Sequence, residues 1–358
     1  MELCVVVPTF NEVQNIEPMV ERLSLALERI EWEVVFVDDD SSDGTADVIR
    51  ALALDNIRVR CLQRIGRRGL STAVIEGMCS TGATYLAVID GDLQHDESLL
   101  PKMLSTLKSE GVDIVIGSRY IVGGSTGAWE DSRARISALA NRLSRLIIKT
   151  ELSDPMSGFF MLRRDAFFSA VRRLSGLGFK ILLDIFSSSP NSLRYKELPY
   201  TFRPRTHGAS KLDSQVAIEY LLLLIDKRVG HVVPARFILF AGIGALGLGV
   251  HLGALWLGLR LVGMGFVTAQ TVATLIAMTS NFYLNNILTY RDRRLRGTRL
   301  LVGLLSFYLV CSVGVLANIG AADYVYKIDQ VWWVAGIAGA FVGAVWNYAM
   351  SSQFTWSR

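Results

Sequence analysis

The chain has 358 residues, of which 51% are hydrophobic and 20% are charged, a composition too apolar for an ordinary soluble protein. The net charge of +4 is too mild to indicate a nucleic-acid-binding protein, and the four cysteines and four histidines show no spacing typical of a redox pair or a zinc site. Charged residues are common up to about residue 230 and sparse from Pro234 onward, which predicts a soluble domain followed by a membrane domain.

The first third of the chain alternates short β-rich runs with helical stretches. Strands are predicted at residues 3–7, 33–37, 57–62, 85–89 and 114–116, and helices at residues 15–30, 43–54, 70–81 and 98–107. This order predicts an α/β fold with a mostly parallel sheet, in which ligands bind beyond the carboxyl ends of the strands. Polar clusters stand at three of those ends: Pro8–Glu12, Asp38–Asp40 and Asp90–Gln94.

Residues 210–229 mix apolar positions with charged ones, a pattern that fits an amphipathic helix on a membrane surface or a buried helix of the soluble domain. Four apolar spans of about 20 residues follow, each long enough to cross a bilayer as a helix, and their short links predict two helical hairpins. The spans cover residues 235–257, 266–288, 300–322 and 331–350. We therefore expect a soluble domain at 1–212, an interfacial helix or linker at 213–233, and a transmembrane domain at 234–358.

The distribution of basic residues predicts the orientation of these spans. The link at residues 291–299 is densely basic, whereas the links at 258–265 and 323–330 carry one basic residue each. By the positive-inside rule, the bases of both hairpins face the cytoplasm. The N-terminus lacks the features of a signal peptide, which places the soluble domain on the same side. We expect a multi-pass protein of the cell membrane.

An internal repeat lies at the ends of the second and fourth spans. Residues 281–290 and 347–356 share an Asn, an aromatic residue, a pair of small polar residues and a final Thr-aromatic pair. The repeat fits interfacial anchoring with hydrogen bonds between helices. It also fits contact with a lipid headgroup or with the soluble domain, and the sequence leaves both interpretations open.

The Asp90-Gly91-Asp92 segment carries the chemistry best suited to a metal ion. In an extended segment, Asp90, Asp92 and Gln94 would project to the same side and offer hard oxygen ligands to Mg²⁺ or Mn²⁺. Such a cation can bridge the oxygens of a diphosphate. Gly91 would let a ligand approach the backbone closely. The alternative is an acidic surface turn.

The Asp38–Asp40 cluster needs an explanation because neighbouring carboxylates repel one another. Hydrogen bonds from a ribose or a base would offset this repulsion. Capping of the following helix would explain Ser42 and Asp43, but it leaves the three preceding aspartates unexplained.

Together the motifs resemble those of the inverting family 2 glycosyltransferases of the Rossmann-like GT-A fold, and among them the dolichol-phosphate mannose synthases. The resemblance covers roughly residues 1–215, and the remaining tail resembles a GtrA-type membrane domain. The motifs occur in one order: Val7–Glu12, Val37–Ser41, Gly69–Ser71, Asp90–His95, Gly117–Tyr120, Asp154–Phe159 and Gly208–Lys211.

The resemblance implies roles for individual residues. It places a nucleoside pocket at Pro8, Phe10, Glu12, Val37 and Asp39. It places the ribose and diphosphate along Asp90 and Gly91, with Mg²⁺ or Mn²⁺ on Asp92 and Gln94. It also implies that a loop at about residues 202–212 grips the diphosphate through Arg205 and Lys211. Three positions depart from the family pattern: Phe10 replaces a Tyr, Gly91 replaces an Ala, and His207 replaces a basic residue.

The acceptor can be argued from its charge. A polyprenyl phosphate is mostly dianionic at neutral pH, so it needs fixed cations and no general base. Arg119 and Arg133 are the candidate cations, and Ser137 completes the predicted phosphate site. Arg119 could instead be a salt-bridge partner, and Arg133 could touch lipid headgroups. Asp154 and Ser157 are expected to shape the floor of the site.

We therefore expect a hexose, mannose from GDP-mannose, to pass to dolichyl or another polyprenyl phosphate by a single inverting displacement. Asp92, Arg119, Arg133, Arg205 and Lys211 would be the catalytic residues. A close alternative is transfer from UDP-glucose to undecaprenyl phosphate. A processive polysaccharide synthase is disfavoured because no Q-x-x-R-W motif is found. A lipid-carrier flippase with a regulatory N-terminal domain is the alternative from another class.

Overall fold

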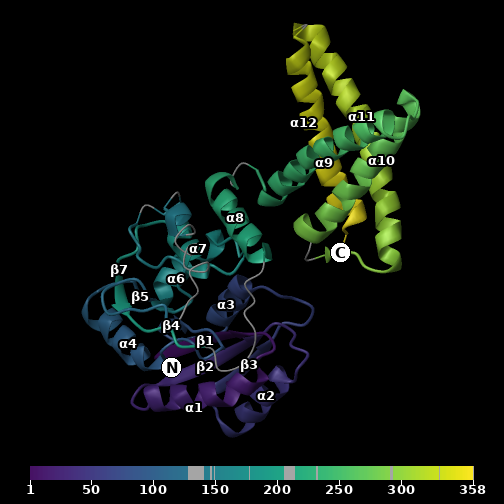
Figure 1. The fold of residues 1–358 in the computed structure, drawn as a ribbon. Helices are drawn as coiled ribbons and strands as arrows, with labels where there is room; N and C mark the ends of the chain where they lie inside the picture. Colours follow the sequence, from purple (N-terminus) through teal and green to yellow (C-terminus); the bar gives the residue numbers. More distant parts are fainter. Residues whose placement is uncertain are drawn as a thin grey trace. The chain divides into compact units, whose positions relative to one another are not determined.

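The computed structural model describes residues 1–127, 141–145, 147–148, 150–176, 178–204, 214–230, 233–290, 293–329 and 331–357. The chain divides into two compact units, Met1–Arg228 and Val229–Arg358. Figure 1 shows an α/β unit built around a sheet and a unit built of long helices.

The first unit is organised around a seven-stranded sheet in the order β3-β2-β1-β4-β6-β5-β7. Every strand runs parallel to its neighbours except β6, which is antiparallel to both β4 and β5. The strands are β1 Leu3–Thr9, β2 Trp32–Asp38, β3 Val59–Gln63, β4 Tyr85–Val88, β5 Ile114–Ser118, β6 Phe160–Arg163 and β7 Tyr195–Pro199. In this register Thr9 lies beside Asp38, so the polar segments that follow β1 and β2 are neighbours.

Helices cover both faces of the sheet because alternate residues of its strands face opposite sides. Leu3, Val5 and Val7 pack in one core cluster with α1, α2 and α4, whereas Cys4 and Val6 pack in another with α3, α6, α7 and α8. Figure 1 shows α1 and α2 on one side of the sheet and α3, α6 and α7 on the other. The helices are α1 Ile16–Ala26, α2 Thr45–Asp55, α3 Leu70–Cys79, α4 Leu100–Ser109, α6 Arg164–Ala170, α7 Ile181–Ser188 and α8 Ser214–Val229.

The predicted elements of the first third are confirmed, with ends that shift by a few residues. The sequence pattern predicts none of β6, β7, α6 and α7. Of the two predictions for the helix over Ser214–Val229, a helix of the soluble domain is the one observed. Its residues Tyr220 and Leu223 are buried in the core of the first unit. Lys227 pairs with the buried Asp184 of the same unit at 2.5 Å.

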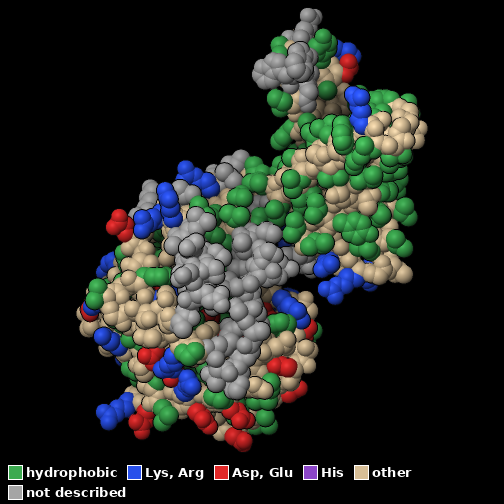
Figure 2. Space-filling model, in the orientation of Figure 1, with side chains coloured by type: hydrophobic (Ala, Val, Ile, Leu, Met, Phe, Trp, Pro, Cys, Tyr) green, Lys and Arg blue, Asp and Glu red, His purple; other side chains and the backbone are tan. Residues whose placement is uncertain are grey.

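The second unit is helical. Its α-helices are α9 Ala235–Arg260, α10 Phe266–Leu284, α11 Thr298–Asp329 and α12 Trp332–Met350. α9 packs against α10, and α11 packs against α12, as two hairpins. Among the described residues, two helices are long and apolar enough to cross a membrane: Arg236–Arg260 and Thr298–Ile328. Figure 2 shows many hydrophobic side chains spread over the visible surface of this unit.

The internal repeat has a structural counterpart at the ends of α10 and α12. Each helix continues into a π-helical turn, Asn285–Thr289 and Ser351–Thr355 respectively. The aromatic residues that end the two copies, Tyr290 and Trp356, are buried and stack with ring centroids 4.2 Å apart. The repeat therefore joins the two hairpins through aromatic packing.

Candidate active site

The polar segments that follow β1, β2 and β4 meet at one edge of the sheet. Each contains a non-glycine residue in the left-handed region: Asn11 at φ 54°, Asp40 at φ 59° and Leu93 at φ 62°. Such residues are uncommon and cost energy, and they cluster at ligand sites, where they aim side chains and backbone groups. The coincidence of three of them supports a ligand site at this edge.

Asp90 lies where β4 leaves the sheet beside β1. Its backbone N–H donates to Nδ1 of the buried His95 at 3.1 Å, which leaves the imidazole proton on Nε2, 3.7 Å from Oδ2 of Asp90. Desolvation raises the pKa of Asp90 and lowers that of His95. Asp90 keeps 34% of its side chain exposed, so its carboxylate remains accessible to a ligand.

The segment from Asp90 to Gln94 forms a turn, and the expectation of an extended segment is wrong. The reversal occurs because Leu93 adopts a left-handed conformation and Oδ1 of Asp92 accepts the N–H of Gln94 at 3.2 Å. The charge of Asp92, two residues along the same turn, adds to the rise in the pKa of Asp90. Both Asp92 and Gln94 are largely buried, at 8% and 7% exposure.

Gln94 is held across the sheet by the chain that follows β7. Its Nε2 donates to the carbonyl of Arg203 at 3.0 Å, and the N–H of Arg203 donates to the carbonyl of Gln94 at 2.9 Å. Arg203 also pairs with Asp96 and Glu97, at 2.7 Å each. The amide nitrogen of Gln94 is thus committed to the protein, and the carbonyl oxygen Oε1 is the end of the side chain suited to a cation.

These residues fit a divalent cation that shares its coordination with a substrate. Among the described residues, no group of three His, Cys, Asp or Glu side chains converges as a metal site. Asp92 and Gln94 offer a carboxylate and an amide oxygen, which suit Mg²⁺ or Mn²⁺. Mg²⁺ in particular typically takes one or two carboxylates and completes its shell with phosphate oxygens and water. The donor set fits a metal–diphosphate site better than a closed metal site.

The segment after β1 offers an aromatic surface. The guanidinium of Arg68 lies over the ring of Phe10, 4.2 Å from its centroid, a cation–π arrangement. Glu12 accepts a hydrogen bond from Asn15 at 2.7 Å, and the carbonyl of Pro8 faces Gly91, where a Cβ would approach it to 3.4 Å. Val37 is fully buried against Gly77, so any contact with a nucleoside would involve its backbone.

The carboxylate of Asp39 forms an ion pair with Arg64. Its Oδ1 accepts from Arg64 and its Oδ2 from the N–H of Gly69, at 2.6 Å each. Desolvation is the largest influence and raises the pKa of Asp39, while Gly69 and Arg64 oppose the rise. The buried Arg64 therefore offsets much of the repulsion within the cluster, and Asp39 fixes the turn that precedes α3.

The two aspartates on either side are also bound within the protein. Asp38 accepts hydrogen bonds from the N–H and hydroxyl of Ser41, and Asp43 accepts one from the N–H of Thr45 at 3.0 Å at the start of α2.

Arg119 follows β5 and forms a buried ion pair with Asp154. Its Nε and Nη2 donate to the carboxylate at 2.7 and 2.8 Å, while its backbone N–H donates at 3.2 Å. Desolvation favours a lower pKa for Arg119, but Asp154 outweighs it and the pKa is raised, so the guanidinium is always charged. Asp154 thus shapes the site by orienting Arg119, and Ser157 donates to the carbonyl of Gly117 at 2.7 Å.

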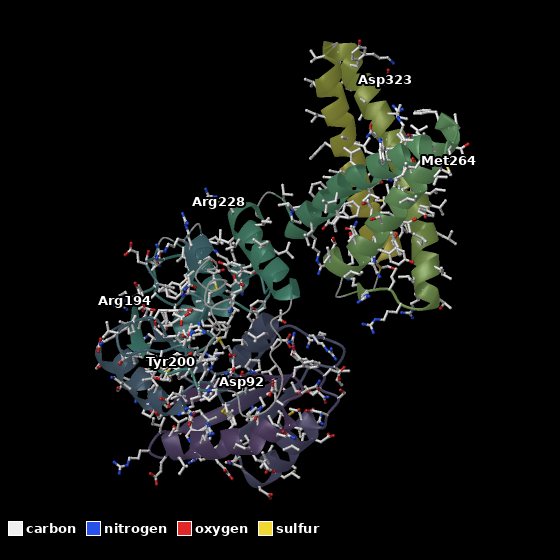
Figure 3. The ribbon with its side chains drawn as sticks, viewed as in Figure 1. Asp92, Arg194, Tyr200, Arg228, Met264 and Asp323 are labelled. Atoms are coloured by element: carbon white, nitrogen blue, oxygen red, sulfur yellow. The ribbon has the colours of Figure 1, made fainter. Side chains whose placement is uncertain are left out.

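Aromatic rings enclose the site beside this pair. His95 stacks on Phe159 with centroids 5.2 Å apart, and Tyr200 and Phe202 meet its ring edge-on. The hydroxyl of Tyr200 is buried and has no hydrogen-bond partner among the described residues. Its pKa is raised, mainly by desolvation, with the charges of Asp154, Asp90 and Asp92 adding to the rise. Figure 3 labels Tyr200 and Asp92 in this part of the first unit.

Four predicted residues, Arg133, Ser137, Arg205 and Lys211, lie outside the described residues, as does His207. The sequence interpretation missed several residues that the structure brings to the site: Arg64, Arg68, Lys180, Tyr200 and Arg203. Lys180 donates to the carbonyl of Met156 at 3.3 Å, and its charge opposes the rise in the pKa of Asp90. The sequence carries only a weak signal for these residues, namely that Arg64 and Arg68 come after the predicted third strand.

Comparisons with known proteins define the class. Residues 4–168 match the model of glycosyl transferase family 2, and residues 239–356 match that of the GtrA/DPMS transmembrane domain. The chain is 32% identical to a dolichol-phosphate mannosyltransferase of Pyrococcus furiosus, with 100% of both chains covered. It is 37% identical to the Mycosarcoma maydis protein of the same name, over 66% of this chain and 82% of that protein.

A solved structure of glucosyl-3-phosphoglycerate synthase from Mycobacterium tuberculosis is 19% identical, with 64% of this chain and 78% of that chain covered and a TM-score of 0.47. The family models and the full-length relative define a family 2 glycosyltransferase with a membrane domain. More narrowly, the chain belongs to the dolichol-phosphate mannosyltransferase family, as its sequence motifs predicted.

Proposed function

We propose that this protein transfers mannose from GDP-mannose to dolichyl or another polyprenyl phosphate. The observation that carries the proposal is the turn after β4, which presents the Asp92 carboxylate and the Gln94 amide at the carboxyl edge of the sheet. The full-length relationship to a dolichol-phosphate mannosyltransferase supports this substrate class.

The donor would lie along the edge of the sheet. The base would stack on Phe10 near Arg68, with Pro8, Glu12, Asp39 and the backbone of Val37 around the nucleoside, and the ribose and diphosphate would pass Asp90 and Gly91. Asp92 and Gln94 would hold Mg²⁺ or Mn²⁺, which supplies charge neutralisation of the diphosphate. Arg205 and Lys211, from the chain that follows Arg203, would grip the same diphosphate.

The acceptor phosphate would bind at Arg119, together with Arg133 and Ser137. An oxygen of the phosphate attacks the anomeric carbon, the bond from that carbon to the diphosphate breaks, and GDP leaves with the electron pair. Inversion at this carbon turns an α-linked donor into a β-linked mannosyl phospholipid. The acceptor is already ionised, so the residues act by orientation and charge stabilisation and need no general base.

The second unit would anchor the enzyme beside its lipid substrate. We propose that four spans cross the membrane, that the basic link at 291–299 faces the cytoplasm, and that the first unit works on that side. The soluble domain would end near residue 212, with 213–233 leading into the membrane domain at 234–358. Protease protection in sealed vesicles, with cleavage sites inserted at 258–265 and 291–299, tests this orientation.

A substrate panel tests the proposed reaction. The full chain in nanodiscs receives Mg²⁺ or Mn²⁺, labelled GDP-mannose or UDP-glucose, and dolichyl or undecaprenyl phosphate. We expect label in the lipid fraction with GDP-mannose and dolichyl phosphate. Preferential labelling from UDP-glucose would contradict the proposed donor, and the absence of labelled lipid with every combination would contradict the proposed reaction class.

A further inference from the structure

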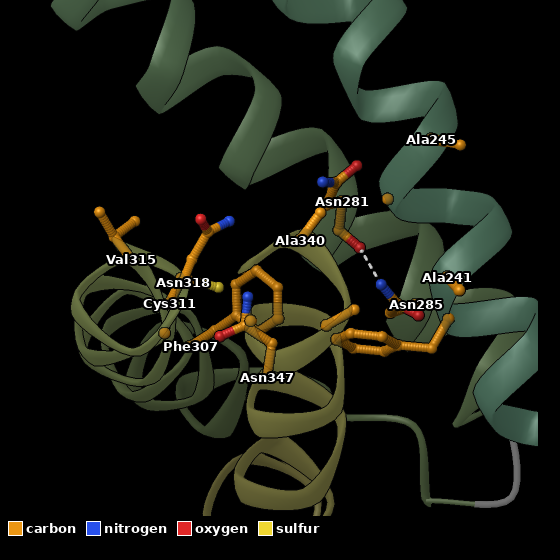
Figure 4. A pocket seen from close by; sticks show the side chains of 15 residues that line it. Ala241, Ala245, Asn281, Asn285, Phe307, Cys311, Val315, Asn318, Ala340 and Asn347 are labelled. Atoms are coloured by element: carbon orange, nitrogen blue, oxygen red, sulfur yellow. Dashed lines mark hydrogen bonds between the residues drawn. The ribbon is translucent and has the colours of Figure 1, made fainter. Parts of the chain in front are cut away.

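The second unit contains a cavity of about 420 Å³, and its polar side chains serve helix packing. Three asparagines line it, namely Asn281, Asn318 and Asn347 (Figure 4). Each packs against a glycine of a neighbouring helix, where a Cβ would collide with the amide. None of the described residues that line the cavity carries a charge. A charged group that could bind the sugar of the donor therefore has to be sought in the first unit.

A short segment of the first unit joins the two sides of the candidate active site. At one end of the segment, Asp154 pairs with Arg119, the cation proposed for the acceptor phosphate. At the other end, Gly158 lies against the carboxylate of Asp90, and a Cβ on this glycine would be 3.0 Å from Oδ2. The segment 154–158 therefore runs from the acceptor side of the site to the donor side.

The side chain of Lys180 is held at the middle of this segment. Its Nζ donates to the carbonyl of Met156 at 3.3 Å and lies 5.0 Å from the ring centroid of Phe179. Consecutive Cα atoms are 3.80 Å apart, so those of Met156 and Gly158 are at most about 7.6 Å apart. The ammonium and the carboxylate of Asp90 thus flank the same short stretch of backbone. In keeping with this arrangement, the charge of Lys180 opposes the rise in the pKa of Asp90.

The loop that carries Lys180 is fixed at both ends. Before it, the buried Asp184 accepts the N–H and the hydroxyl of Ser175, at 2.9 Å each. Within it, the carbonyl of Gly178 accepts the N–H of Ser71 at 3.3 Å, which joins the loop to α3. After it, α7 begins at the residue that follows Lys180. A side chain on a backbone held in this way binds a ligand at a low cost in ordering.

The place of the hexose follows from the proposed reaction. Its anomeric carbon is bonded to the diphosphate at the turn after β4 and is attacked by the phosphate bound at Arg119. The sugar therefore lies between these two sides, along the segment 154–158. Positive charge develops beside the anomeric carbon in such transition states, so an ammonium is best placed at a hydroxyl remote from that carbon. An ammonium has three N–H donors, which suit hydroxyl oxygens.

We propose that Lys180 binds the transferred hexose, with Nζ donating to the oxygen of a hydroxyl at C3, C4 or C6. Lys180 is then a specificity-determining residue, because a donor whose hydroxyl is absent or differently oriented loses this hydrogen bond. The inference rests on the proposed function and adds to it a residue that contacts the sugar itself.

One variant combined with a set of donors tests this contact. The full chain in nanodiscs receives Mg²⁺ or Mn²⁺, dolichyl phosphate, and GDP-mannose or its 2-, 3-, 4- or 6-deoxy analogue. We expect Lys180→Met to lower kcat/KM for GDP-mannose roughly 10- to 100-fold, as for the loss of a hydrogen bond from a charged group. With the deoxy donor that lacks the bound hydroxyl, the same substitution should lower kcat/KM by less than about twofold.

Lys102→Met, at an exposed position of α4, is the matched control and should leave kcat/KM unchanged with every donor. An equal loss with every donor, or a smaller loss with the 2-deoxy donor alone, would overturn the inference. A matching rise in the Kd for GDP would also overturn it, since that result is expected of a contact with the diphosphate. If the wild type transfers nothing from GDP-mannose, the proposed function fails as well, so the two failures are distinguishable.

Chemical labelling of the wild type gives a second test that needs no variant. The full chain with Mg²⁺ is treated with acetic anhydride in the presence of GDP or GDP-mannose, and peptide mass spectrometry gives the acetylation rate at Lys180. The exposed Lys102 is the internal reference. We expect acetylation of Lys180 to be several-fold slower with GDP-mannose than with GDP, because only the former carries the hexose. Equal rates with the two nucleotides would overturn the inference.

Discussion

Arg119 and Asp154 form a bidentate ion pair across 35 residues of sequence, with Nε and Nη2 of the guanidinium 2.7 and 2.8 Å from the carboxylate. Both side chains are buried, at 9% and 0% exposure. The Nε–Nη2 edge of the guanidinium is held by both oxygens of Asp154, which fixes the plane of the group. Asp154 is therefore a positioning residue for the cation that we propose to bind the acceptor phosphate.

Asp154→Ala should destabilise the first unit strongly, because it leaves the charge of Arg119 buried without a partner. Loss of one member of a buried pair costs about 3–5 kcal/mol, which calorimetry would detect as a lower unfolding temperature. Asp113→Asn is the matched control, since its partner Arg194 is exposed, and it should change the unfolding temperature little. Equal effects of the two substitutions would contradict the assignment of Arg119 and Asp154 as a structural pair.

Gly158→Ala should lower activity with little loss of stability. A Cβ at this position would lie 3.0 Å from Oδ2 of Asp90, so the carboxylate must move from the place where the donor is expected. The activity, measured as kcat/KM for the nucleotide sugar, should fall roughly tenfold or more, because small displacements of positioning groups have large effects on rate. Gly82→Ala, which meets no atom within 4 Å, is the control. An unchanged kcat/KM for Gly158→Ala would show that Asp90 does not contact the donor.

The strand-end clusters were predictable from sequence because each follows an apolar strand, and parallel strands bring their carboxyl ends together. The partners of these clusters were not predictable. Arg64 is 25 residues from its partner Asp39 in the sequence, and Gln94 is 109 residues from Arg203, whose backbone it contacts. Only the folded sheet brings these residues together.

Two errors have local causes. The turn at Leu93 was missed because a leucine gives no signal of a left-handed backbone, which usually requires Gly or Asn. β6 was missed because its four residues, Phe160–Arg163, contain only three apolar positions, too few to distinguish strand from helix or to indicate strand direction.

Arg68→Ala should weaken nucleotide binding without affecting the fold. The guanidinium lies over Phe10, the ring proposed to stack on the base, and an exposed cation–π contact is worth roughly 0.5–1 kcal/mol. The Kd for GDP, measured by calorimetry, should rise by a factor of roughly 2–5. Arg67→Ala removes the neighbouring arginine, which pairs with Glu76, and should leave the Kd unchanged. A larger rise with Arg67→Ala would contradict the proposed position of the base.

Tyr200→Phe should separate stability from activity. Its hydroxyl has no partner among the described residues, so removal should leave the unfolding temperature unchanged or slightly higher. Its ring meets those of His95 and Phe159, and His95 accepts the N–H of Asp90, so Tyr200 lies beside the proposed donor site. We expect kcat/KM to fall by roughly tenfold. A lower unfolding temperature with unchanged kcat/KM would assign the hydroxyl a structural role.

The most direct test of the proposed metal–diphosphate site is transfer of labelled mannose from GDP-mannose to dolichyl phosphate by Asp92→Ala, beside the wild type and the exposed-site control Asp165→Ala. We expect Asp92→Ala to lose at least about 10²-fold in kcat, because it removes a group that acts on charge developing in the transition state. Asp165→Ala should retain full activity, and EDTA should abolish transfer by the wild type. Full activity of Asp92→Ala, in a protein that unfolds at the wild-type temperature, would contradict the assignment of the metal–diphosphate site to the turn after β4.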